Sequence, residues 1–217
     1  MSKERAGLTP EETDVLIVVD VQNDFLPGGA LAVPDGDAVI EPINRLAQAF
    51  RHVVLTQDWH PAGHASFASS HSGRQPFETA ELSYGSQVLW PDHCIQGTRG
   101  AEISRDLGIP HAQLVIRKGH NPEIDSYSGF MEADRKTSTG LAGYLKERGF
   151  RRVFCAGLAT DFCVAWTALD AKAAGFDTYL IEDASRAIDA NGSLARARQD
   201  LNAARVQVIG SAQVVGG

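Results

Sequence analysis

The chain has 217 residues, of which 43% are hydrophobic and 22% are charged. This apolar content excludes an intrinsically disordered or collagen-like chain, because such chains bury no ordinary hydrophobic core. The formal net charge is -7 and no run rich in lysine and arginine stands out, which argues against a protein that binds along nucleic-acid phosphates.

No stretch approaches the roughly 18 consecutive apolar residues that a membrane-spanning helix needs. Residues 1–14 are polar and mixed in charge, without the apolar core of a signal peptide. We therefore expect a cytoplasmic protein that does not bind a membrane. The three cysteines, Cys94, Cys155 and Cys163, are an odd number in a chain of this length, so no disulfide framework is expected.

Short runs of Val, Ile and Leu recur along the chain, and such runs are typical of parallel strands buried on both faces. They predict strands at residues 15–19, 53–56, 114–117, 153–155, 178–181 and 206–209. Helices are predicted between them, at residues 39–50, 139–148, 161–174 and 193–204. Alternating strands and helices with right-handed crossovers predict an α/β fold, a three-layer α/β/α sandwich around a six-stranded parallel sheet.

Two long segments interrupt this alternation, at residues 61–100 and 119–136, and both are rich in Gly, Pro, Ser, Asn and His. Loops of this length are uncommon unless they are functional. No internal repeat or linker is evident, so residues 1–217 are expected to form a single domain. Ligands of open parallel sheets bind beyond the carboxyl ends of the strands, and the residues just after each strand are therefore the candidates for a site.

Reactive side chains follow three of the predicted strands. Asp20 comes directly after an apolar run, which would leave its carboxylate short of water and suited to act as a base. Arg117 and Lys118 face opposite sides of their strand, so only one of them can point into a shared site. Cys163 falls in the first turn of a helix with Thr160 as its expected N-cap, where the helix dipole favours a thiolate.

Simpler roles for these residues stay open at this point. A free cysteine is most often a core residue, and Cys155, inside a strand, fits that role. Asp20 could cap the next segment, and Lys118 could be a solvated residue at the end of its strand. A buried Lys118 would instead need an anionic partner, for which Asp20 or the Cys163 thiolate would serve.

A second set of polar residues follows the second predicted strand. Asp58 and His60 stand two residues apart, so in an extended segment their side chains face the same way. A carboxylate and an imidazole together suit a divalent metal such as zinc, iron or manganese. His64 follows four residues later and His93 lies further along the chain. Alone, an Asp-x-His pair is usually structural.

Together these residues belong to motifs that resemble the nicotinamidase family of the isochorismatase-like cysteine hydrolase superfamily. The motifs span nearly the whole chain and are Asp20–Phe25, Gln57–Pro61, Trp90–Cys94, Arg117–Gly119, Asp125–Ser128 and Gly157–Val164. The resemblance implies a six-stranded parallel sheet with helices on both faces and a cis peptide between Leu158 and Ala159. It also implies a cytoplasmic enzyme of NAD salvage that hydrolyses nicotinamide to nicotinic acid and ammonia, with pyrazinamide as a further substrate.

The resemblance assigns a role to individual residues. The implied catalytic triad is Asp20, Lys118 and Cys163, with the backbone N–H groups of Ala159 and Cys163 as the oxyanion hole. The implied ligands of one divalent metal ion, zinc before iron or manganese, are Asp58, His60 and His93, and His64 matches a fourth position that only some members use. The implied substrate pocket is lined by Phe25, Trp90, Tyr127 and Leu158.

The implied mechanism passes through a thioester. Asp20 takes the proton of Cys163, Lys118 steadies the charges, and the thiolate attacks the carboxamide carbon. Asp20 then protonates the departing ammonia and activates water to release the acid. The metal would bind the ring nitrogen and so position the substrate.

Other functions compete with this one. A related cysteine hydrolase acting on a carbamoyl or ureido compound would share the three catalytic residue types but resembles the chain less at the metal motifs. A true isochorismatase lacks the nucleophile, so Cys163 argues against it. A non-catalytic binding protein would have little need for a complete set of such residues. In a fourth alternative, metal-activated hydroxide attacks the substrate and Cys163 is a bystander. The sequence leaves the oligomeric state open, a homo-oligomer included.

Overall fold

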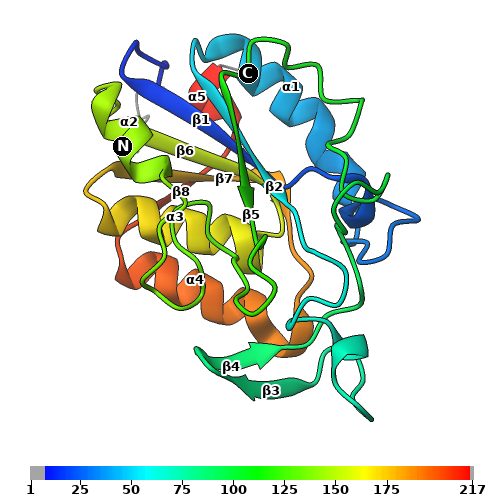
Figure 1. The fold of residues 1–217 in the computed structure, drawn as a ribbon. Coiled ribbons are helices and arrows are strands. Elements are labelled where there is room, and N and C mark those ends of the chain that lie inside the picture. Colours follow the sequence, from blue (N-terminus) through cyan, green and yellow to red (C-terminus); the bar gives the residue numbers. More distant parts are fainter. Residues whose placement is uncertain (1–7, 216–217) are drawn as a thin grey trace.

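Six parallel strands form the main sheet of the computed structural model, which describes residues 8–215 (Figure 1). They are β1 (Asp14–Val19), β2 (Val53–Asp58), β5 (Leu114–Lys118), β6 (Arg152–Leu158), β7 (Asp177–Arg186) and β8 (Gln207–Ile209). Their order across the sheet is β5-β2-β1-β6-β7-β8. All six predicted strands are confirmed, and β7 runs further than expected, to Arg186.

Helices cover both faces of the sheet, as the predicted sandwich requires (Figure 1). They are α1 (Ile40–Ala49), α2 (Leu141–Glu147), α3 (Ala165–Ala173), α4 (Ser193–Ala203) and α5 (Ala212–Val215). Apolar side chains of α1 and α5 pack against one face, and those of α2, α3 and α4 against the other. Successive residues of β1 alternate between the two cores, Leu16 and Val18 in one and Ile17 and Val19 in the other.

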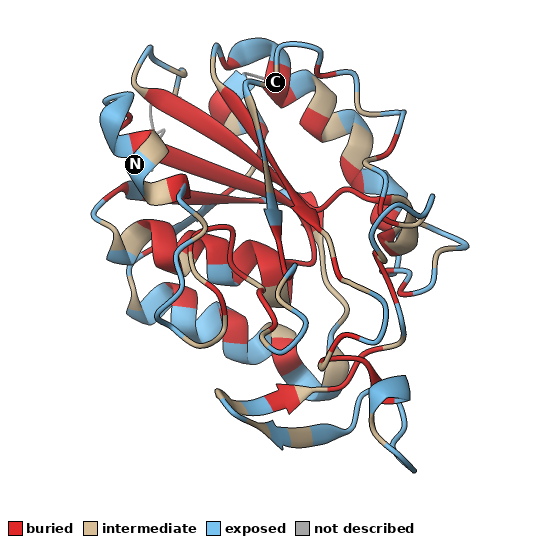
Figure 2. Ribbon diagram, viewed as in Figure 1, coloured by how far each residue is buried: buried red, intermediate tan, exposed pale blue. Residues whose placement is uncertain are grey.

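The central strands are buried throughout, which explains their continuous apolar sequences (Figure 2). Every residue of β1 and β2 is buried, whereas the edge strand β5 alternates until its last residue, Lys118. Within residues 8–215, no helix combines the length and the apolar character needed to cross a bilayer. The polar segment expected at residues 1–14 lies partly outside the described residues.

A small antiparallel hairpin, β3 (Thr79–Leu82) and β4 (Gly85–Val88), stands apart from the main sheet (Figure 1). It falls in the segment that was expected to be a loop. Its strands have four residues each and mostly exposed or half-buried side chains, so the sequence carries no apolar run that would reveal them. The hairpin nevertheless contributes to the site through Gln87, described below.

The helix predicted to start at Asp161 begins differently. Thr160–Val164 form a π-helical turn before α3, and the Val164 N–H donates to the Ala159 carbonyl oxygen at 3.0 Å. Ala159 is therefore the N-cap, and no side chain caps the turn. The expectation that Thr160 is the N-cap was wrong, because the wider turn draws Thr160 inside the helix.

The strand order reverses between β1 and β6. From β1 the chain builds outward through β2 to β5, and it then returns to add β6, β7 and β8 on the other side. Such a reversal leaves a crevice at the carboxyl ends of the two strands, which is where open parallel sheets bind ligands. The residues that follow β1 and β6 therefore lie where a site is expected.

Candidate active site

Asp20, Lys118 and Cys163 meet beyond the carboxyl ends of β1, β5 and β6. The Lys118 Nζ lies 2.8 Å from Asp20 Oδ2 and 3.3 Å from Cys163 Sγ. The same ammonium contacts Asp58 Oδ1 and donates to the Ser126 carbonyl oxygen at 2.9 Å. Asp20 and Lys118 are fully buried, and Cys163 is 6% exposed. The three residues of the predicted triad are thus brought together around one ammonium.

Strand alternation explains why Lys118 is the cation of the site. Its neighbour Arg117 turns outward, and the guanidinium of Arg117 stacks on the Trp59 ring at 3.8 Å. Burial alone would lower the pKa of Lys118, but the carboxylates of Asp20 and Asp58 outweigh it and hold this pKa well above its ordinary value. The buried ammonium therefore stays charged.

Burial raises the pKa of both Asp20 and Cys163. The Lys118 charge opposes this shift in each case without cancelling it, and the thiol pKa lies well above its ordinary value. Burial therefore opposes the helix dipole, which was expected to favour the thiolate of Cys163. A neutral thiol needs a base, and a carboxylate with a raised pKa is a stronger base than an ordinary one.

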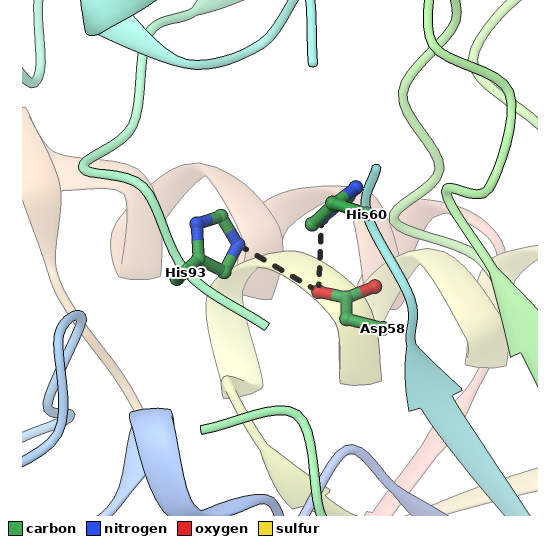
Figure 3. A group of neighbouring side chains, drawn as sticks. All are labelled: Asp58, His60 and His93. Atoms are coloured by element: carbon green, nitrogen blue, oxygen red, sulfur yellow. Dashed lines mark ion pairs between the residues drawn. The ribbon is translucent and has the colours of Figure 1, made fainter. Parts of the chain in front are cut away.

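Asp58, His60 and His93 form a second group, the ligand cluster (Figure 3). Asp58 Oδ2 lies 3.7 Å from His60 Nε2 and 3.9 Å from His93 Nε2, and all three side chains are buried. The Nδ1 atoms bond backbone carbonyl oxygens, that of His60 to Gly119 at 2.9 Å and that of His93 to Pro91 at 2.8 Å. Metal-binding histidines are commonly oriented in this way, so the cluster fits a divalent metal.

The pKa shifts of two of the three residues, Asp58 and His93, also favour metal binding. Burial alone would raise the pKa of Asp58, but Lys118 and His60 outweigh it and hold this pKa well below its ordinary value. Burial and the His60 charge lower the pKa of His93 to about 4. An ionised carboxylate and a neutral imidazole are the forms that bind metal. Burial alone would lower the pKa of His60, but the carboxylates of Asp58 and Asp125 together outweigh it and raise this pKa instead.

Gly119 leaves room for one of the ligand rings. Its φ is +65°, and a Cβ at this position would come 2.4 Å from Cε1 of His60. Glycine is therefore required here both for the backbone conformation and for the close approach of the imidazole.

His64 lies beside the ligand cluster, but its ring nitrogens bond elsewhere. Its ring centroid is 4.4 Å from that of His60. Its Nδ1 pairs with Ser66 Oγ at 2.7 Å, and its Nε2 with the Asn121 carbonyl oxygen at 2.9 Å. His64 groups with His60 and Asp125 rather than with the whole cluster. The structure does not bring this predicted fourth ligand to the other three.

A narrow cavity separates the ligand cluster from Cys163. Three of the four residues expected to line it do so, namely Phe25, Trp90 and Tyr127. Leu158 instead lies fully buried in the apolar core, and the next residue, Ala159, lines the cavity. The remaining wall is formed by Leu31, Asp125, Phe162 and Ile188. The cavity is thus mostly aromatic and aliphatic, with the ligand cluster and the thiol exposed to it.

Two polar residues, Asp125 in this wall and Gln87 bonded to it, were not predicted to have individual roles. Asp125 is buried, and Gln87 of β4 donates to its Oδ2 at 2.8 Å and to the Tyr127 hydroxyl at 2.9 Å. Trp90 Nε1 also donates to that hydroxyl, at 3.0 Å. Asp125 belongs to one of the motifs noted above, but no local signal identifies Gln87, since it lies in the segment expected to be a loop.

The turn that carries Cys163 is anchored on Ala159. The Leu158–Ala159 peptide is cis, as the resemblance implied. The N–H groups of Phe162 and Val164 both donate to the Ala159 carbonyl oxygen, at 3.1 and 3.0 Å. These bonds flank Cys163 on both sides and hold its sulfur against Lys118.

Comparisons with known proteins show similarity to the isochorismatase domain family and to nicotinamidases. A model of the isochorismatase domain family matches residues 14–213. A nicotinamidase from Acinetobacter baylyi is 60% identical over 200 residues, which cover 92% of this chain and 94% of that protein. The structure of a nicotinamidase and pyrazinamidase from Acinetobacter baumanii has a TM-score of 0.92 at 62% identity, over 93% of this chain and 97% of that one. A crystal structure of a pyrazinamidase from Pyrococcus horikoshii in complex with zinc has a TM-score of 0.75 at 36% identity, over 91% and 99%.

Proposed function

The chain belongs to the isochorismatase domain family, and on that premise we propose that it is an amidohydrolase that converts nicotinamide to nicotinic acid and ammonia. Pyrazinamide, an aromatic carboxamide of similar shape, is proposed as a second substrate. The observation that carries the proposal is the Lys118 ammonium 2.8 Å from Asp20 Oδ2 and 3.3 Å from Cys163 Sγ, with Cys163 in the wall of the cavity. We further propose that residues 1–217 form one domain, because a single family model matches residues 14–213.

The first half of the reaction forms a thioester. Asp20 accepts the thiol proton of Cys163, and the sulfur attacks the carboxamide carbon. The Lys118 charge lies beside both groups and stabilises the negative charge on each. Asp20 then gives the proton to the leaving nitrogen, the C–N bond breaks, and ammonia departs. The product of this half is an acyl group on Cys163 beside an ionised Asp20.

The second half returns the enzyme to its starting state. Asp20 takes a proton from water, whose oxygen attacks the thioester carbon. The C–S bond breaks, the sulfur regains its proton, and nicotinic acid is released. In both halves we propose that the backbone N–H groups of Ala159 and Cys163, at the two sides of the turn, stabilise the negative oxygen.

Asp58, His60 and His93 would hold one divalent ion, which when bound supplies a Lewis acid for the ring nitrogen of the substrate. We propose zinc, because a carboxylate with two imidazoles suits it and the Pyrococcus horikoshii relative was solved in complex with zinc. Iron and manganese accept the same donors. His64 would become a fourth ligand only on giving up its bond to the Asn121 carbonyl oxygen.

The aromatic wall would hold the substrate ring between the two groups of residues. Phe25, Trp90 and Tyr127 present flat apolar surfaces to the cavity, and the Tyr127 hydroxyl is held by Trp90. Leu158 would support this wall from the core, since it does not reach the cavity itself.

The test is an ammonia-release assay on nicotinamide, pyrazinamide and an N-carbamoyl amino acid, with metal analysis of the same sample. We expect the two aromatic amides to be hydrolysed and about one zinc ion per chain. Faster hydrolysis of the carbamoyl compound would contradict the proposal and favour a related cysteine hydrolase.

A further inference from the structure

Gln22 and Asp24 are two of the polar residues in the segment Asp20–Phe25 whose side chains the proposed reaction does not use. Both bond to the backbone of segments that carry the ligand cluster. We propose that Gln22 and Asp24 are positioning residues that set the placement of Asp58, His60 and His93 relative to one another. This inference rests on the proposed metal site and extends it to residues that do not touch the ion.

Gln22 holds the carboxylate ligand. Its side chain is fully buried, and its Oε1 accepts the backbone N–H of Asp58 at 2.7 Å. Its Nε2 donates to the Asp58 carbonyl oxygen at 2.8 Å and to the Ala101 carbonyl oxygen at 2.9 Å. One side chain thus pairs with both backbone polar groups of Asp58 and ties them to a third segment.

The end of β1 explains why a side chain is needed here. The strands β1 and β2 run in parallel with Val18 opposite Leu55, and β1 ends one residue later. The chain then turns away at Asp20, whose φ is +48°, so Asp58 lies beyond the paired part of β1. The Gln22 carboxamide offers the same donor and acceptor as a peptide group, and it continues the ladder where the strand has stopped.

Asp24 holds the two imidazole ligands through one residue. Its Oδ2 accepts the Cys94 N–H at 2.7 Å, and that N–H belongs to the peptide bond between His93 and Cys94. The Cys94 carbonyl oxygen accepts the His60 N–H at 3.0 Å. Gly100 lies against the carboxylate, since a Cβ there would come 2.1 Å from Asp24 Oδ2. The backbones of both histidines are therefore anchored at Cys94, and Asp24 fixes that anchor.

Asn23, between these two residues, provides a matched contrast. Its side chain also bonds to a backbone carbonyl oxygen, that of Arg99 at 2.7 Å, but this bond is exposed and involves no residue of the ligand cluster. If a variant lost zinc affinity only because the segment Asp20–Phe25 became looser, Asn23→Ala should therefore lose zinc affinity as well.

The experiment measures the zinc dissociation constant of full-length protein by chelator competition, after the metal has been stripped. Gln22→Met keeps the side-chain volume and removes all three bonds, and Asp24→Ala removes the acceptor of the Cys94 N–H. We expect each to weaken zinc binding by about 10–100-fold, the usual effect of losing a residue that orients ligands. Asn23→Ala should bind zinc with the wild-type affinity.

The unfolding temperatures of the metal-free proteins show whether a variant is destabilised as well as weaker in zinc binding. Zinc affinities are compared only among variants that circular dichroism shows to be folded. Should Gln22→Met fail to fold, Gln22→Asn, which keeps the amide but shortens the reach, is measured in its place. Folded variants that bind zinc as tightly as wild type, or an Asn23→Ala that loses affinity equally, would overturn the inference and leave the metal site standing. A wild-type protein that binds no zinc would overturn the proposed metal site itself and the inference with it.

Discussion

The triad and the ligand cluster flank one cavity, but the chain builds them differently. Asp20 follows the buried strand β1, Lys118 ends the edge strand β5, and Cys163 lies in the turn after β6, so sheet register largely sets their positions. Only Asp58 of the ligand cluster comes from the sheet, where it pairs with Lys118. The two histidines come from irregular segments held by bonds between side chains and backbone. We therefore expect the triad to depend on charge and burial, and the cluster and pocket on single hydrogen bonds.

Cys163→Ala should have the largest effect on activity, because it removes the proposed nucleophile from the triad. The turnover number should fall at least about a thousandfold, as for other enzymes that lose their nucleophile. The control is Cys155→Ala, a fully buried cysteine within β6 that should retain most activity. Ammonia release is the measurement, and a near-normal rate from Cys163→Ala would rule out the covalent mechanism.

Lys118→Met should abolish activity and also destabilise the fold. It leaves the buried carboxylates of Asp20 and Asp58 without their cation, which typically costs about 3–5 kcal/mol of the free energy of unfolding. The measurement is urea denaturation followed by circular dichroism. The exposed Lys146, replaced by Met, should leave the unfolding curve unchanged. Equal stability of the two variants would contradict the claim that Lys118 offsets the buried charges of Asp20 and Asp58.

Gln87→Ala should have a smaller effect on activity, because it disturbs only the wall of the pocket. It removes the donor shared by Asp125 and Tyr127, and a lost buried hydrogen bond costs about 1–3 kcal/mol. We expect kcat/KM for nicotinamide to fall about tenfold, mainly through KM, since the nucleophile is untouched. Gln75→Ala, an exposed change in the same segment, is the control. A fall in kcat alone would contradict a role in shaping the pocket.

The same contrast explains what could be predicted from the sequence. Apolar runs are local, so the strands and the residues at their ends could be identified, and these include Asp20, Lys118 and Asp58. The supports of the ligand cluster and pocket could not, because Gln22 bonds to a residue 36 positions away and Gln87 to one 38 positions away. The raised pKa of Cys163 could not be predicted for a related reason, since the helix dipole is a local feature whereas burial depends on the whole fold.

The division of labour between triad and ligand cluster can be tested by removing the metal and comparing two substrates. Nicotinamide and benzamide share the carboxamide, but only nicotinamide has the ring nitrogen. A metal that positions the substrate through this nitrogen should therefore matter far more for nicotinamide. The measurement is the ratio of the two kcat/KM values, with and without metal. Each tenfold change in this ratio corresponds to about 1.4 kcal/mol of transition-state binding specific to the nitrogen.

We predict that the ratio of nicotinamide to benzamide hydrolysis falls when the metal is removed, because the thiol, the base and the ammonium already supply what amide cleavage requires. His60→Ala should lower the ratio in the same direction without a chelator. If both substrates instead lose activity by the same factor, the ratio stays constant. That result would contradict the positioning role and favour a metal that activates water for both amides.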